Sequence, residues 1–228
     1  MRLPKFAPLQ WLTHLGSLAP LAVILWLYFT DGLTVNPIQD ITFRTGKAAL
    51  VLLVLSLACT PLNTLFNFRA ALKLRRPLGV YAFLYVCLHF LTFIGLDYGF
   101  DLGLIYEAIF EKRFALVGFA AFLILLPLAI TSTKGWQKRL GKAWKTLHKA
   151  VYLAAPLAVV HYVWLVKSDV REPLAYGAVV AALLLMRAPA VKRLVKGVGR
   201  TLAPPGARPA GPRVKPAKAG RLPADGQD

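Results

Sequence analysis

Acidic residues and cysteines are scarce in this chain, whereas long segments without charge are common. Only 10 of its 228 residues are Asp or Glu, against 28 Lys and Arg, which gives a formal net charge of +18. The two cysteines, Cys59 and Cys87, both lie inside apolar segments, which argues against a disulfide framework and indicates small packed side chains. With 57% hydrophobic residues and a mean hydropathy of +0.56, the chain has more apolar surface than a soluble domain of this length buries. We therefore expect an integral membrane protein.

The N-terminal segment does not have the pattern of a cleavable signal peptide. Arg2 and Lys5 precede an apolar run that reaches Phe29, which is longer than a signal core, and no clear small-residue cleavage site follows it. We interpret this run as a first spanning helix that stays in place.

Six apolar segments follow one another along the chain, and the first five contain no Asp, Glu, Lys or Arg. These five have 17–21 residues, close to the about 20 residues that a helix needs to cross a bilayer. The sixth is shorter and spans a membrane only if Arg187 snorkels and the helix continues through Val191. The expected fold is all-α, an integral membrane bundle of six transmembrane helices. The segments are Leu9–Phe29, Ala48–Phe66, Leu78–Leu96, Phe114–Thr131, Ala150–Val166 and Leu174–Met186.

Basic residues gather in alternate connections between these segments. If the N-terminus is cytoplasmic, 22 of the 28 Lys and Arg residues lie on the inner side, and eight of the ten acids lie on the outer side. The positive-inside rule therefore predicts that both termini are cytoplasmic. We divide the chain into a six-helix domain, residues 1–195, and a basic, disordered cytoplasmic tail, residues 196–228, which is rich in Pro, Ala and Gly. The positive-inside rule accounts for the basic charge, and the tail is expected near anionic membrane lipid, so no nucleic-acid partner is expected.

The four histidines lie in or at the edge of predicted spans, where an ionisable side chain is costly and usually functional. His89 and His161 fall toward the outer side of the third and fifth segments, whereas His14 and His148 fall toward the inner side of the first and fifth. Two neutral imidazoles at one level on different helices suit the iron of a six-coordinate haem b. We therefore predict His89, His161, His148 and His14 as haem ligands, with His14 the least supported of the four.

Other roles stay open for these histidines. His89 and His161 are also compatible with a role as buried polar residues that bond to the backbone or to each other, and His148 and His14 are also compatible with residues at the membrane interface. His148 and His161 are thirteen residues apart, which is ~20 Å along an ideal helix and about 140° around it. They face different clefts unless the helix is over- or under-wound, and Pro156 between them is the residue best able to cause this.

Several segments resemble the signature segments of one family. They are RRPLGVYAFLYVCLHF from Arg75, TSTKGWQKRLGKAWKTLHKAVY from Thr131 and HYVWLVK from His161, together with RTGKAAL at Arg44 and TPL at Thr60. In this order they are similar to the MsrQ family, formerly YedZ, over about residues 10 to 195. That family belongs to the wider ferric reductase-like transmembrane group.

The resemblance implies a haem b subunit of a periplasmic methionine sulfoxide reductase system in the bacterial inner membrane. The implied partners are the molybdopterin enzyme MsrP as electron acceptor, and the quinone pool or a cytosolic flavin reductase as donor. The resemblance also implies one or two bound haems and allows bound FMN. By motif position, the haem ligands of the family correspond to His89, His148, His161 and, less directly, His14. The larger group has two histidines on each of two helices, whereas the third segment here has only His89, which favours one haem on His89 and His161. No NADPH- or FAD-binding domain follows the sixth segment, so we expect a separate donor.

The expected function is vectorial electron transfer, with no substrate chemistry of the protein's own. Electrons are expected to enter near Arg75, Arg76 and the basic segment 134–149, and to leave beneath the outer segments 97–113 and 167–172. A proton-relay transporter and a purely structural membrane anchor are the alternatives. The absence of charged residues from the first five segments disfavours the transporter, because proton and ion pathways usually contain them.

Overall fold

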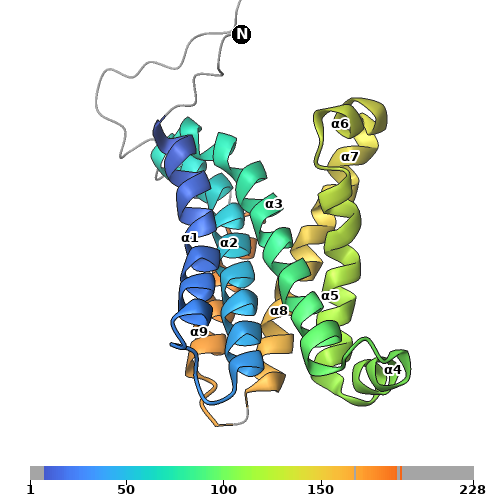
Figure 1. Cartoon of the computed structure of the whole chain (residues 1–228). Coiled ribbons are helices and arrows are strands. Elements are labelled where there is room, and N and C mark those ends of the chain that lie inside the picture. Colours follow the sequence, from blue (N-terminus) through green and yellow to red (C-terminus); the bar gives the residue numbers. More distant parts are fainter. Residues whose placement is uncertain (1–7, 167, 189–190, 192–228) are drawn as a thin grey trace, which may run out of the picture.

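The computed structural model describes residues 8–166, 168–188 and 191, and in this part the regular structure is entirely helical (Figure 1). The all-α prediction is therefore confirmed for the described residues, whereas the predicted tail, 196–228, lies outside them. A π-helical turn, η1 (Thr92–Asp97), extends α3, and a 3₁₀ turn, η2 (His148–Ala150), precedes α8. The α-helices are α1 (Pro8–Phe29), α2 (Pro37–Phe66), α3 (Arg69–Leu91), α4 (Leu102–Glu111), α5 (Arg113–Ile130), α6 (Lys134–Leu140), α7 (Lys142–Leu147), α8 (Val151–Leu165) and α9 (Arg171–Leu185).

Each of the six predicted segments forms a helix. Within the described ranges, four stretches are long and apolar enough to cross a membrane by length and composition: α1, α2, α5 and the continuous stretch Arg69–Asp97. α8 and α9 have 15 residues each, fewer than the about 20 of a usual span. The repeated long apolar helices indicate a multi-pass membrane protein.

The start of α2 differs from the sequence prediction. The helix begins at Pro37, well before the predicted start at Ala48, because its polar first turns have their own stabilising contacts. The Asn36 side chain accepts a hydrogen bond from the Gln39 backbone N–H at 3.2 Å, and Pro37 occupies the first turn, where a missing N–H costs nothing. The short helices α4, α6 and α7 were not predicted either, since none of them is a long apolar run.

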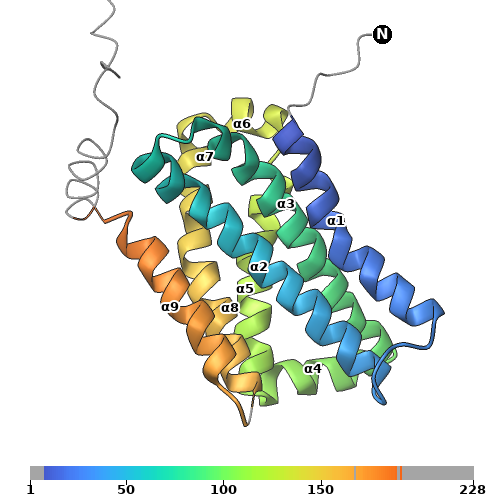
Figure 2. The ribbon, with the colours of Figure 1, turned by 90° about the vertical axis from the view of Figure 1, so that its left-hand side faces the viewer.

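Two helix pairs form the centre of the bundle. α2 packs along α3, α5 packs along α8, and the two pairs face each other, with α1 outside the first pair and α9 beside α2 and α8 (Figures 1 and 2). α6 and α7 lie at one end of the bundle, and α4 lies across the other (Figure 2). We call these the α6–α7 end and the α4 end.

The hydroxyl of Tyr85 connects α3 to the backbone of α1. It donates to the Ser17 carbonyl at 2.8 Å and accepts from the Leu21 N–H at 2.9 Å, two groups that a regular helix would pair with each other. These contacts lie beside Pro20, which has no N–H of its own. Tyr85 is fully buried, so its hydroxyl serves two backbone groups of α1 where no water reaches them.

Candidate functional site

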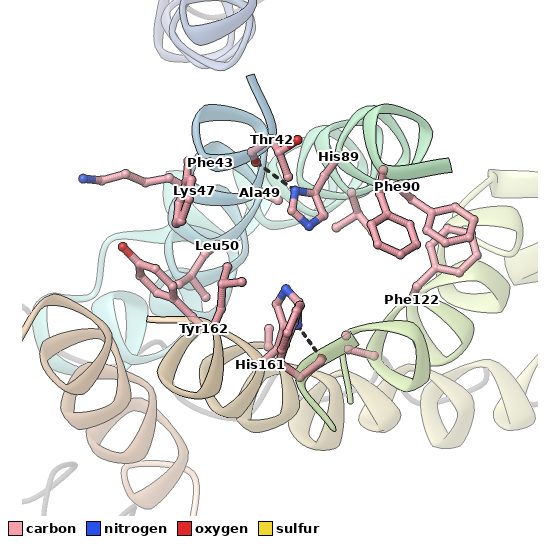
Figure 3. A pocket seen from close by; sticks show the side chains of 18 of the residues that line it. Thr42, Phe43, Lys47, Ala49, Leu50, His89, Phe90, Phe122, His161 and Tyr162 are labelled. Carbon is pink, nitrogen blue, oxygen red and sulfur yellow. Dashed lines mark hydrogen bonds between the residues drawn. The ribbon is translucent and has the colours of Figure 1, made fainter. Parts of the chain in front are cut away.

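His89 of α3 and His161 of α8 line the same cavity near the α4 end. The cavity has a volume of about 450 Å³, within the usual range for ligand sites, and lies between the α2–α3 pair and the α5–α8 pair. The two imidazole rings point into it from opposite walls (Figure 3). Their centroids are 6.0 Å apart, and the ring planes are close to perpendicular, at 85°. The predicted meeting of these two side chains is thus seen in the fold.

One nitrogen of each ring contacts a backbone carbonyl of a neighbouring helix. His89 Nδ1 lies 2.9 Å from the Thr42 carbonyl oxygen, and His161 Nδ1 lies 2.7 Å from that of Phe114. A carbonyl only accepts hydrogen bonds, so each Nδ1 carries the proton and each Nε2 carries a lone pair. Neither Nε2 has a hydrogen-bond partner among the described residues. Both rings are therefore oriented as metal-ligating histidines usually are.

Two glycines make these contacts possible. In an α-helix the carbonyl of residue i points toward residue i+4, and here those positions are Gly46 after Thr42 and Gly118 after Phe114. A Cβ atom on Gly118 would lie 2.6 Å from His161 Nδ1, and one on Gly46 would lie 3.1 Å from His89 Nδ1. Any larger residue would therefore displace the imidazole from the carbonyl.

The two halves of the site are related by an internal repeat. Each histidine follows its carbonyl residue by 47 positions, and the second set is shifted by 72 residues from the first (114 − 42 and 161 − 89). The same shift matches six identical residues in the two helix pairs, which sequence reasoning missed although the pattern is present in the chain. They are Gly46 and Gly118, Ala48 and Ala120, Ala49 and Ala121, Leu53 and Leu125, Ala82 and Ala154, and His89 and His161.

These residues fit a haem better than a bare metal ion. Among the residues with described positions, no group of three or more His, Cys, Asp or Glu side chains converges on one point. Two imidazoles suffice for a porphyrin iron, because the porphyrin supplies the four remaining nitrogens. Metal–imidazole bonds are about 2 Å long, so two such bonds plus the distance from each ring centre to its nitrogen account for a centroid separation near 6.0 Å.

His148 lies in a second cavity, of about 260 Å³, toward the α6–α7 end. Its ring stacks on Trp144 at a centroid distance of 3.9 Å, and its Nδ1 is 3.1 Å from the Trp144 carbonyl oxygen. His148 Nε2 is buried and has no hydrogen-bond partner among the described residues. Arg75 and Arg76 line the same cavity. This site is therefore cationic and holds one imidazole.

The two cavities lie between the same helix pairs, because Leu53 and Leu125 line both. For His148 and His161 to face cavities between the same helix pairs, the chain between them must depart from regular α-helical winding. It does so at His148 itself, in the 3₁₀ turn η2. Phe83 of the second cavity and Phe122 of the first are stacked, with centroids 6.0 Å apart.

His14 lies elsewhere. Its Nδ1 is 2.9 Å from the Tyr81 hydroxyl of α3, and it lines neither cavity described above. The structure therefore brings His89 and His161 together, but it does not bring His14 together with His148.

Comparison with known proteins gives one consistent result. A family model described as "Ferric reductase like transmembrane component" matches residues 45–159. Three similar proteins are named protein-methionine-sulfoxide reductase heme-binding subunit MsrQ. The one from Herminiimonas arsenicoxydans is 42% identical over 81% of this chain and 86% of its own length. The one from Xanthomonas axonopodis pv. citri is 43% identical over 76% and 82%, and the one from Caulobacter vibrioides is 42% identical over 77% and 84%. No solved structure matches the chain.

Proposed function

This chain belongs to the MsrQ family of ferric reductase-like transmembrane proteins, and on that premise we propose that it carries electrons across a bacterial inner membrane. It serves as the haem b-binding subunit of a protein-methionine-sulfoxide reductase system, in line with the names of its relatives. The observation that carries this function is the pair of facing imidazoles, His89 and His161, each with an unbonded Nε2 atom.

In this function His89 and His161 would hold one haem, each through its Nε2 atom. When bound, the haem would supply one-electron chemistry. The chain supplies the geometry: the carbonyls of Thr42 and Phe114 hold the Nδ1 protons, which keeps both Nε2 atoms aimed into the cavity. The apolar walls exclude water and so influence the potential at which the iron is reduced.

The proposed topology has six spans, α1, α2, α3, α5, α8 and α9, with both termini in the cytoplasm. The short α8 is supported as a span by the helical residues before it, since α7, η2 and α8 follow each other without interruption from Lys142 to Leu165. The α6–α7 end then faces the cytoplasm, in agreement with the basic residues of both short helices. The α4 end faces the periplasm, where the acceptor MsrP docks.

Electrons enter at the cytoplasmic end, at the cavity lined by His148, Arg75 and Arg76. The quinone pool or a cytosolic flavin reductase is the donor. The stacked rings of Phe83 and Phe122 support this route, because they join that cavity to the one that holds His89 and His161. The lining of the second cavity contains His148 but no other imidazole that could hold a second haem with it. We therefore propose one haem per chain. FMN binding stays a prediction.

The test of this proposal is the haem content of variants purified in detergent. His89→Ala and His161→Ala each remove one of two axial ligands, so both variants are expected to lose the haem absorption bands of the wild-type protein. His14→Ala is the matched control, because it deletes an intramembrane imidazole that lies outside the cavity, and it is expected to keep the wild-type spectrum. Wild-type haem content in either of the first two variants contradicts the ligand assignment. A colourless wild-type protein, expressed with sufficient haem, contradicts the function.

A further inference from the structure

The cavity of His89 and His161 has two chemically different ends (Figure 3). Lys47 and Tyr162 lie at one end, and Phe90 and Phe122 lie at the other. Phe43 also lies at the first end, beside Lys47, so the two ends differ in the polar groups that only the first one carries. The polar or charged lining residues include Arg44, Lys47, Tyr162 and Glu172, and the phenylalanines of the lining include Phe90, Phe93, Phe114, Phe119 and Phe122.

At the polar end, three side chains from three helices form one cluster. Lys47 Nζ of α2 lies 2.5 Å from Glu172 Oε1 of α9, and the Tyr162 hydroxyl of α8 donates to Glu172 Oε2 at 3.2 Å. The Lys47 and Glu172 side chains are 52% and 46% exposed, so this ion pair is hydrated and contributes little stability. Lys47 can therefore exchange the Glu172 carboxylate for another one at small cost.

The opposite end offers no such partner. The ring of Phe90 stacks on those of Phe122 and Phe119, with centroids 4.8 and 5.8 Å away and ring planes inclined by 25° and 30°. A carboxylate placed against these rings would lose its hydration without gaining a cation or a hydrogen-bond donor, which is strongly unfavourable. An apolar group would instead bury its surface there.

Haem b has the same asymmetry, since both of its carboxylates lie on one edge of the porphyrin and apolar substituents lie on the others. We propose that Lys47 binds the haem carboxylates, which orients the porphyrin with that edge toward α2 and α9, and that Glu172 competes with them for the Lys47 ammonium group. This inference rests on the proposed function and extends it to the residues that orient the cofactor.

A purely structural role of the cluster gives a different expectation. If the Lys47–Glu172 pair only holds α2 to α9, removing either charge loosens the cavity, and haem leaves faster in both variants. If Lys47 binds the carboxylates, removing its charge speeds haem loss, whereas removing the charge of Glu172 frees Lys47 and slows it. The two substitutions then have opposite signs.

The experiment measures haem transfer from the purified protein to excess apomyoglobin. Lys47→Gln is expected to lose haem about tenfold faster than wild type, since one hydrogen bond between charged groups is removed. Glu172→Gln, which keeps the shape of the side chain, is expected to lose haem about threefold more slowly. Lys112→Gln is the matched control: this lysine bonds to the Tyr98 hydroxyl outside the cavity, and its loss is expected to leave the rate unchanged.

A second measurement uses iron protoporphyrin IX dimethyl ester, whose carboxylates carry no charge. Loaded with this ester, the wild-type protein and Lys47→Gln are expected to lose the porphyrin at the same rate. Faster haem loss in both glutamine variants, an unchanged rate in either one, or a difference between the two ester-loaded proteins overturns the role of Lys47. These results differ from failure of the proposed function, in which the wild-type protein binds no haem at all.

Discussion

At the scale of single residues, the position of each imidazole depends on the absence of a side chain on the facing helix. Gly118 leaves the carbonyl of Phe114 open to His161, and Gly46 does the same for His89. The two imidazoles are thus held by backbone atoms, which substitution of Thr42 or Phe114 does not remove. Gly46 and Gly118 are the positions at which a substitution would displace the imidazoles.

Gly118→Ala is expected to weaken haem binding without removing a ligand. The new methyl group would lie 2.6 Å from His161 Nδ1 and would force the ring away from the Phe114 carbonyl. Overpacking of this kind costs about 1–3 kcal/mol, which corresponds to at least about fivefold weaker binding. The haem-to-protein ratio and the absorption spectrum test this expectation. Gly16→Ala is the control, since a Cβ there would meet no atom within 4 Å; equal haem content in both variants would show that the close approach has no consequence.

The sequence predicted the histidine pair but not the glycines. An imidazole inside an apolar segment is conspicuous, because burying it is costly. A glycine in a membrane helix is common and carries no such signal. Only the 72-residue repeat distinguishes Gly46 and Gly118 from the other glycines, and it becomes recognisable once the hydrogen bonds of His89 and His161 are compared.

At the scale of helices, the hydropathy of the sequence predicted each long helix but missed the polar turns at helix ends, as at the start of α2. The turns of α2 before Ala48 are helical because Asp40 and Arg44 form an ion pair one turn apart, at 2.7 Å, beside the Asn36 cap. A search for apolar runs does not detect such contacts. Pro156 was the candidate to over- or under-wind the fifth segment, but the over-wound turn is η2 at His148, which a residue count along an ideal helix does not reveal.

The contact between α3 and α1 gives a prediction at this scale. Tyr85→Phe leaves the Leu21 N–H and the Ser17 carbonyl without their buried partner, which costs about 1–3 kcal/mol. We expect a lower midpoint of thermal unfolding in detergent, with an unchanged haem spectrum, because α1 lines neither of the cavities of His161 and His148. Tyr98→Phe, which removes an exposed hydroxyl, is the control. Equal midpoints for the two variants would indicate that water or lipid replaces the Tyr85 hydroxyl.

At the scale of the whole molecule, the repeat explains why one haem per chain is expected. Shifting His148 back by 72 positions reaches Arg76, which lines the same cavity as His148. The cavity near the α6–α7 end therefore has an imidazole from one helix pair and a guanidinium from the other. A guanidinium is always protonated and has no lone pair for iron, so this cavity lacks the second ligand.

His148→Ala tests the single-haem expectation. The variant is expected to keep a haem-to-protein ratio near that of the wild type, together with the same split bands after reduction by dithionite, because the ligands His89 and His161 are untouched. Reduction through the natural donor is expected to slow, since His148 lines the proposed entry cavity. If the variant instead lost half of the wild-type haem, two haems per chain would be present.

The pairing of α2–α3 with α5–α8 has a consequence for how the cofactor enters. Each helix pair contains one of the two imidazoles, together with the glycine and the carbonyl that orient it. Neither pair alone therefore forms the arrangement of two facing imidazoles. Both helix pairs must therefore be inserted and packed together before the proposed haem can bind to both imidazoles.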